Sequence, residues 1–345
     1  MGKTKKLPPA QSATPSKVAQ KNVFKQPKQP KQPNRITVPK PKPNRLLVNI
    51  IKNPYFPLLP ALKIKTMKTA FVQFHLLHLS LLGWHAFLCT KGKANQTAQN
   101  IDSQVLLREI KDENLKDPNG FLPTAMSDAD IQQVINIRNN TAHLDLNSID
   151  KTAMTDLPAL VLLNRSINQP AVATEIQRII NEMSAGNLDG LVTFSFAFTP
   201  GFSFEKAFGL SQIVYGVILE YLADALMTLL LSKLNLANIT FDVFANMKYI
   251  MDQVNTNQDY LAPGGGTRGD AQLLAIVFDT RNDNAHDAFV RSTTDWHLQL
   301  DSVHDILNVI NHQAEAVEVK NIIDRLVELQ AEGATVTQED FTFFE

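Results

Sequence analysis

The chain has little cysteine, little glycine and no acidic residue over its first hundred positions. Its 345 residues include one cysteine, Cys89, and 14 glycines, which excludes a disulfide-stapled or collagen-like protein. The amino-terminal region is polar and lysine-rich, without the apolar core of a secretory signal or the arginine content of a typical mitochondrial presequence. We therefore expect a protein that is not secreted, and its hydrophobic content of 44% is enough for a folded body.

The formal net charge of -1 hides a strong segregation of charge. No Asp or Glu precedes Asp102, whereas 18 of the 33 Lys and Arg residues do. The remaining 15 basic residues share the rest of the chain with all 34 acidic residues. This arrangement predicts a cationic arm that binds a polyanion, joined to a body that repels one.

The basic arm is rich in proline as well as lysine. Residues 1–45 contain 12 Lys or Arg and nine Pro, with a Lys-Gln-Pro repeat over residues 25–33. Proline removes backbone donors, and so few apolar residues cannot offset the entropy of ordering, so we expect an extended, disordered arm. Its charges suit phosphates rather than base edges, although a trafficking or solubilising tail is the alternative. The predicted nucleic-acid-binding residues are Lys3, Lys5, Lys6, Lys17, Lys21, Lys25, Lys28, Lys31, Arg35, Lys40, Lys42 and Arg45.

Residues 71–89 hold no formal charge and are long enough to span a membrane. These residues include three histidines, and the matching segment of the second half carries Glu220 and Asp224. Such polar side chains favour a buried helix of a soluble body, so we expect no stable membrane insertion. His75, His78 and His85 fall on one helical face, and the first two have an i, i+3 spacing that suits a metal. No Asp, Glu or Cys converges on them, so we predict a polar stripe, with neither a metal nor a cofactor.

A shift of 143 positions aligns the chain with itself. The segment RNNTAH at 138–143 falls on RNDNAH at 281–286, and 12 of the 46 positions from 138 to 183 are identical. About three identities are expected of unrelated chains. The same shift places Ser127 on Asp270, and both are plausible helix N-caps. The sequence therefore predicts two copies of one helical unit.

Each copy shows the same order of patterns, which predicts a mainly α fold of two tandem-duplicated helical-bundle units. A long apolar helix (about 66–89, then 209–235) precedes a more polar helix, a loop, a capped helix that ends at the repeated motif and an amphipathic pair. The predicted domains are the arm (1–50), the first unit (51–190), a Phe-rich connector (191–208), the second unit (209–335) and an aromatic tail (336–345).

The connector alternates phenylalanine with small residues, which is the period of a β-strand. A Pro-Gly turn at 200–201 then predicts a hairpin, and the aromatic residues of the tail are candidates to extend it. A lone hairpin is marginally stable, so it packs either on the body or on another subunit, and both interpretations stay open. The predicted interface residues are Phe194, Phe196, Phe198, Phe202 and Phe204.

The repeated motif resembles the Arg-x4–6-His motif of the HEPN superfamily of helical RNA-binding domains and ribonucleases. Its pairing within one chain resembles the arrangement in type VI CRISPR RNA-guided nucleases, where two motifs meet across a domain interface. The resemblance implies metal-independent RNA cleavage, with arginines that clamp the phosphate, histidines that move protons and asparagines that orient them. The residues that match are Arg138, Asn139, His143, Arg281, Asn282 and His286.

A structural role for the motif is weighed equally. A spacing of five places Arg and His roughly 140° apart on a regular helix, so convergence requires a distorted helix or the other copy. The same side chains can form a buried polar clasp between the copies, with their donors satisfied by Asp or by backbone carbonyls.

The combination of a basic arm, an acidic helical body and aromatic extensions resembles the helical coat proteins of partitiviruses and related small double-stranded RNA viruses. This resemblance implies a non-enzymatic, self-assembling coat protein that packages RNA without sequence preference, located in the virion or the host cytoplasm. It covers more of the chain than the nuclease motif and is the leading interpretation. A tandem HEPN-like ribonuclease is the alternative, and a chromatin-like or membrane-surface adaptor is the third.

Overall fold

The computed structural model describes residues 59–93, 97–233, 242–257, 260–261, 268–286 and 289–344. The chain divides after Lys42 into two units. The first unit lies outside the described residues, together with the predicted disorder of the arm and all 12 basic residues predicted to bind nucleic acid. The described helices and strands all belong to the second unit, Pro43–Glu345.

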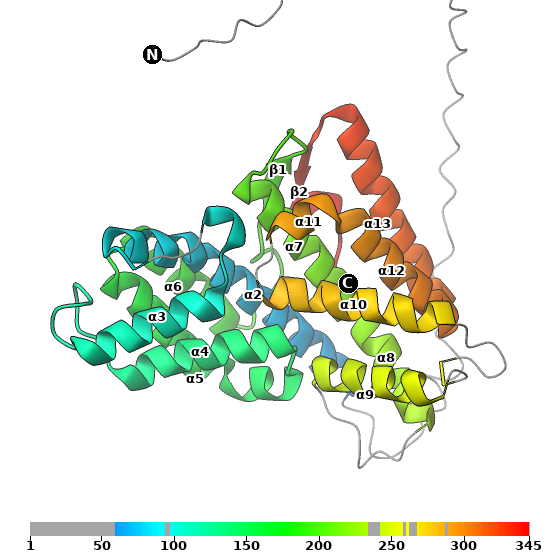
Figure 1. The fold of residues 1–345 in the computed structure, drawn as a ribbon, viewed down its shortest axis with the longest axis horizontal. Coiled ribbons are helices and arrows are strands. Elements are labelled where there is room, and N and C mark those ends of the chain that lie inside the picture. Colours follow the sequence, from blue (N-terminus) through cyan, green and yellow to red (C-terminus); the bar gives the residue numbers. More distant parts are fainter. Residues whose placement is uncertain are drawn as a thin grey trace, which may run out of the picture. The chain divides into compact units, whose positions relative to one another are not determined.

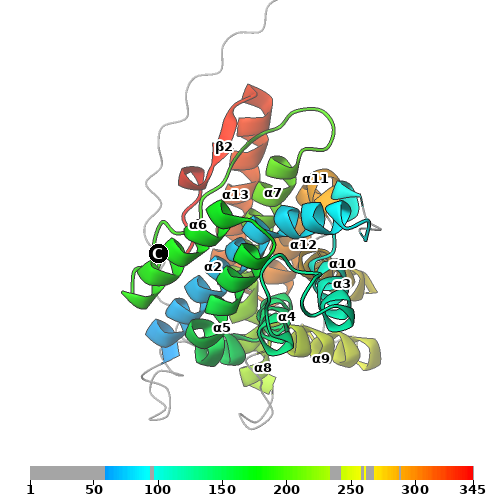
Figure 2. The ribbon, with the colours of Figure 1, turned by 90° about the vertical axis from the view of Figure 1, so that its left-hand side faces the viewer.

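The described body is mainly helical, as predicted (Figure 1 and Figure 2). The helices of the first copy are α2 (Leu59–Thr90), α3 (Ser103–Lys116), α4 (Asp128–His143), α5 (Leu146–Ser166) and α6 (Pro170–Ser184), with a 3-10 turn at Ala98–Asn100. Those of the second copy are α7 (Phe204–Val217), a π-helical segment (Ile218–Leu222), α8 (Ala223–Lys233), α9 (Val243–Thr256), α10 (Arg268–Ala285), α11 (Phe289–Thr294), α12 (Trp296–Val309) and α13 (Gln313–Glu332).

Helix ends in the two copies repeat at the spacing found in the sequence. Helices α6 and α13 begin at 170 and 313, 143 positions apart. Asn168 and Asn311, also 143 apart, both adopt the left-handed conformation, with φ of 62° and 63°. The backbone therefore follows the same path between the last two helices of each copy.

The copies differ where the second one is interrupted. Helix α5 is continuous, whereas its counterpart is divided into α11 and α12 at Asp295. The preceding Thr-Thr-Asp run favours a break, because these short polar side chains compete for backbone hydrogen bonds. Ser127 is the N-cap of α4 as predicted, and its Oγ accepts from the Asp130 amide at 3.1 Å. The prediction for Asp270 is wrong, because Asp270 lies inside helix α10, of which Arg268 is the first described residue.

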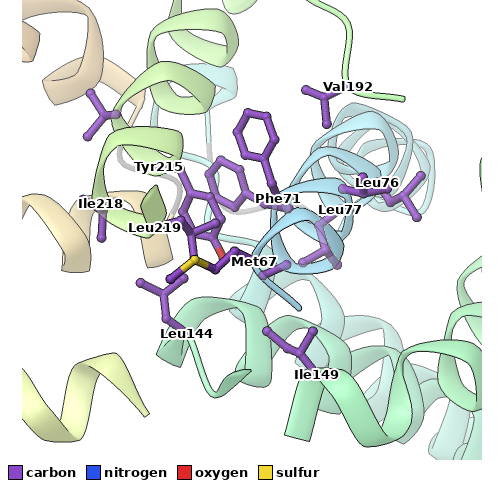
Figure 3. Packing of buried hydrophobic residues seen from close by; sticks show 14 of the residues in the cluster. Met67, Phe71, Leu76, Leu77, Leu144, Ile149, Val192, Tyr215, Ile218 and Leu219 are labelled. Carbon is purple, nitrogen blue, oxygen red and sulfur yellow. The ribbon is translucent and has the colours of Figure 1, made fainter. Parts of the chain in front are cut away.

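One hydrophobic core extends through both copies, and Figure 3 shows side chains of α2, such as Phe71, packed beside Tyr215 and Leu219 of the segment that runs from α7 to α8. The rings of Phe74 and Tyr215 stack with centroids 3.8 Å apart, and His78 faces Phe208 at 5.1 Å. Among the described residues, these two helices are long and apolar enough to cross a membrane, and 72% of each apolar window is buried inside the body. Their apolar character is accounted for by their central position in this core.

The predicted strand in the connector is present, but its partner is not the one expected. Strand β1 (Ser195–Ala197) pairs antiparallel with β2 (Thr335–Thr337), so that Phe196 faces Val336. The second half of the expected hairpin instead begins helix α7 at Phe204, because the Ser203 hydroxyl caps that helix by accepting from the Lys206 amide at 3.1 Å.

The aromatic residues of the connector and tail pack within the chain. Phe194 and Phe196 are buried, whereas Phe198, Phe202 and Phe204 are half-buried against the core. In the tail, Phe341 and Phe344 are buried and add no strand beyond β2. Their contacts are to the body, and the Phe344 ring lies 5.6 Å from that of Phe71 on α2. Packing on the body of the same chain accounts for the buried rings. For the half-buried rings, contact with another subunit remains a prediction.

The histidine stripe of α2 lies mostly inside the protein. His75 and His78 are buried and His85 is half-buried. Burial, together with the charge of the nearby His78, lowers the pKa of His75 to about 3. Among the described residues, no group of three or more His, Cys, Asp or Glu side chains is placed to hold a metal ion.

Candidate functional site

The two repeated motifs meet where the C-terminal ends of α4 and α10 come together, near the middle of Figure 1. Nη2 of Arg138, from the first copy, lies 3.4 Å from Nδ1 of His286, from the second. Arg138 does not contact the histidine of its own motif in the interactions described for it, as the spacing of five on a helix predicts. The histidine beside Arg138 therefore comes from the other copy.

Asp102 joins the arginine of one copy to the histidine of the other. It is the N-cap of α3, where its Oδ1 accepts from the Gln104 amide at 2.7 Å. The same Oδ1 lies 3.6 Å from Nη2 of Arg138, and Oδ2 lies 3.1 Å from Nδ1 of His286. Nε of Arg138 donates to the Ser103 hydroxyl at 3.2 Å. The guanidinium is thereby held by the first turn of α3.

The other half of the site has a related but different arrangement. Asp242 is the N-cap of α9, the counterpart of α3. Burial lowers the pKa of both Arg281 and His143, and the charge of Asp242 offsets part of that lowering. An aromatic ring replaces the direct ion pair there, because Arg281 lies over the Phe244 ring at 4.3 Å. His143 contacts the edge of the same ring at 5.0 Å. The two halves therefore approximate a twofold relation without repeating each other's bonds.

Burial sets the electrostatics of this site. The exposed fractions of Arg138 and Arg281 are 3% and 4%. Burial lowers the pKa of Arg281 to about 10, which leaves it charged at neutral pH. Its Nε and Nη2 have no hydrogen-bond partner among the described residues. Burial also lowers the pKa of His143, and the charge of Arg281 lowers it further, so the neutral imidazole is favoured at pH 7.

The asparagine of each motif accepts a hydrogen bond from the arginine that precedes it. Asn139 Oδ1 accepts from Nη1 of Arg138 at 3.4 Å, and Asn282 Oδ1 accepts from Nη1 of Arg281 at 2.9 Å. Neither contact orients an imidazole, so that part of the expected arrangement is not observed. Asn139 and Asn282 instead help to hold the buried guanidiniums in place.

The chemistry available at this site depends on which side chains are exposed. His143 and His286 reach solvent, and a neutral imidazole at His143 is suited to accept a proton. The arginines are buried, and Arg138 already lies beside a carboxylate, so a phosphate would have to displace Asp102 to be clamped there. A structural role, in which these side chains only join the two copies, does not require Asp102 to be displaced.

Asp102, Asp242 and Phe244 are not among the site residues predicted from sequence. A signal for the aspartates is present, since Asp102-Ser103 and Asp242-Val243 each precede an apolar-periodic run, which is an N-cap pattern. Phe244 carries no local signal, because its role depends on the opposing copy. The predicted interface phenylalanines lie in and around β1, and none contributes to the contacts described between the two motifs.

Comparisons of the chain with protein-family models, curated proteins and solved structures found no match.

Proposed function

We propose that this protein is a coat protein that packages RNA through its basic arm and assembles through its duplicated helical body. The observation that carries the proposal is the segregation of charge, with 18 basic residues and no acid before Asp102. Such an arm binds phosphates regardless of base sequence, and the acidic excess of the remainder limits adhesion of RNA to the body.

The geometry of the body supports a structural protein. Both copies share one core, and the tail is held on it by buried aromatic rings. The repeated motif is accounted for as a clasp, because its arginines are buried and held by side chains of the neighbouring helices. In this proposal, copies of the chain form the shell and the arms face the packaged RNA.

The direct test is electron microscopy of the purified full-length protein together with its ratio of absorbance at 260 and 280 nm. Particles with a high ratio are expected. Removal of residues 1–45 is expected to leave particles or oligomers and to reduce the ratio to that of protein alone. A matched variant, with the same 12 Lys and Arg changed to Gln, keeps the length of the arm and separates charge from excluded volume.

Salt dependence gives a second measurement. Each phosphate contact contributes a slope of about 0.7–0.9 in log affinity against log salt, so several arm contacts give a steep dependence. The slope is expected to fall as Lys25, Lys28 and Lys31 are changed to Gln. A protein that stays monomeric and does not bind RNA at low salt would contradict the proposal.

A tandem ribonuclease is the second candidate, and the contact of Arg138 with His286 favours it, because paired motifs that meet across an interface are what the HEPN resemblance implies. The test is cleavage of single-stranded RNA in the presence of EDTA by the full chain and by the His143→Ala/His286→Ala variant. Cleavage by the first and not by the second, with assembly unchanged, would favour the enzyme. Absence of cleavage by both favours the clasp.

A further inference from the structure

A pocket of about 540 Å³ lies beside α2, outside the site where the copies meet. Its volume is within the range of roughly 300–1,000 Å³ that is common for ligand sites. Three parts of the chain enclose it, namely α2, the loop that follows α6 and the C-terminal tail, and Figure 2 shows the C-terminal end close to α2 and α6. The lining side chains include Phe71, Val72, Val192 and Phe343.

The rim of the pocket is polar and carries excess negative charge. Lys68 forms an ion pair with Asp189, whose own side chain is largely exposed. Glu339 also lines the opening, so one ammonium group stands against two carboxylates. The lining offers polar and apolar surface in similar amounts, so the ligand that fits carries both kinds of group and is neutral or cationic.

We propose that side chains of the segment 46–57 of the same chain occupy this pocket. The segment, Leu-Leu-Val-Asn-Ile-Ile-Lys-Asn-Pro-Tyr-Phe-Pro, has seven large apolar or aromatic side chains, one basic residue and no acid. Its apolar side chains match the apolar part of the lining, Asn49 and Asn53 match the polar part, and Lys52 matches the charge of the rim. Exposure of so many apolar side chains to water is unfavourable, and docking in the pocket would remove part of their surface from water.

The connectivity permits this placement. The described chain begins at Leu59, the first residue of α2, and Lys68 and Val72 of the same helix line the pocket. At about 1.5 Å per helical residue these positions lie roughly 14 and 20 Å along α2. Twelve extended residues span up to roughly 40 Å, which is enough for the segment to reach the pocket from the start of α2. Pro54 and Pro57 favour the extended form that such docking requires.

The test is cross-linking in the full-length protein. Cys89 is exposed and is the one native cysteine, so a Cys89→Ser background removes competing thiols. Phe56→Cys is combined with Thr342→Cys, an exposed residue at the pocket, and treated with a short bis-maleimide. The matched control replaces Thr342→Cys by Thr155→Cys, an exposed position on α5. We expect at least fivefold more intramolecular product for the pocket pair.

Proteolysis gives an independent readout. Chymotrypsin is expected to cleave after Tyr55 and Phe56 at least fivefold faster in a Thr342→Trp variant, whose added ring fills the pocket. Cleavage after Phe24 in the arm is the internal control and should not change. The two measurements require neither RNA nor assembly, so their outcome is separate from that of the proposed function.

Three results would overturn the inference. Equal cross-linking of the pocket and control pairs would show that the segment is not placed there. Cross-linked dimers in place of intramolecular product would assign the pocket to the segment of a second copy. Cleavage at Tyr55 and Phe56 that is already fast in the wild type, and unchanged by Thr342→Trp, would leave the pocket to a different occupant.

Discussion

Arg138 and His286 belong to different copies of the repeat and lie 148 positions apart, yet Nη2 of the arginine is 3.4 Å from Nδ1 of the histidine. Asp102 reaches the same nitrogen at 3.1 Å. Arg138 requires a bare Nδ1 as an acceptor, whereas Asp102 requires an N–H as a donor. Whether Nδ1 of His286 carries a hydrogen therefore selects which of the two groups it binds, and both choices keep the copies joined.

This relationship predicts unequal effects of mutation within one motif. Arg138→Met is expected to lower the free energy of unfolding by about 2–4 kcal/mol, because it leaves Asp102 without its buried cationic partner. His286→Ala is expected to lower it by about 0.5–1 kcal/mol, since the side chain is half exposed. Urea denaturation measures both, and Arg178→Met is the control, because Arg178 and Glu175 form an exposed pair. Equal effects at Arg138 and Arg178 would argue against a clasp.

The duplication predicts matched behaviour at Asn168 and Asn311. Both side chains are exposed and both residues have positive φ, a conformation that asparagine and glycine tolerate better than other residues. Asn→Ala is expected to lower the free energy of unfolding by about 1 kcal/mol at each position, and Asn→Gly to change it little. Denaturant midpoints of the four variants measure this. A large effect at one position only would show that the two turns are not equivalent.

The periodic features of the chain were predictable from sequence because they depend on neighbouring residues. The apolar runs predicted α2 and the helix α7 to α8, and the amphipathic pattern at the end of each copy predicted α6 and α13. Ser127 was identified as a cap by its position before the apolar run of α4. Alternation of phenylalanine located β1.

Features that depend on distant residues were not predictable in the same way. The partner of β1 lies about 140 positions away at β2, and a Pro-Gly turn nearby favoured a local hairpin instead. The π-helical segment at Ile218–Leu222 has no sequence signal, and its counterpart in α2 is regular α-helix. The pairing of Arg138 with His286 required knowledge of how the copies pack, although the helical spacing showed that one motif alone does not converge.

The buried His75 predicts a loss of stability in acid. Burial lowers its pKa in the folded state to about 3, whereas an unfolded histidine has a pKa of about 6.5. Below pH 6.5 the unfolded chain binds a proton that the folded chain does not, so stability falls as pH decreases from 6.5 towards 3. The slope is about 1.4 kcal/mol per pH unit.

Replacement of His75 by Leu removes this linkage. Between pH 7 and pH 5 the variant is expected to lose about 2 kcal/mol less free energy of unfolding than the wild type. Urea denaturation at the two pH values measures the difference. His297→Gln is the control, because His297 is half exposed on α12. The same pH dependence in the wild type and His75→Leu would show that His75 is accessible to protons in the folded state.

Gly209 lies in helix α7, where a Gly→Ala substitution ordinarily stabilises a protein by about 1 kcal/mol. Here a Cβ would lie 2.2 Å from Cδ1 of Phe196, and that ring is 4% exposed and packed between α7 and the core. We therefore expect Gly209→Ala to destabilise the protein by about 1–3 kcal/mol, because the ring and β1 must shift. In a Phe196→Ala background, itself destabilised, the same substitution is expected to be neutral or stabilising, because the clash is gone. Thermal or urea denaturation of the four proteins gives this double-mutant cycle. Stabilisation by Gly209→Ala alone would mean that the connector strand does not lie against α7.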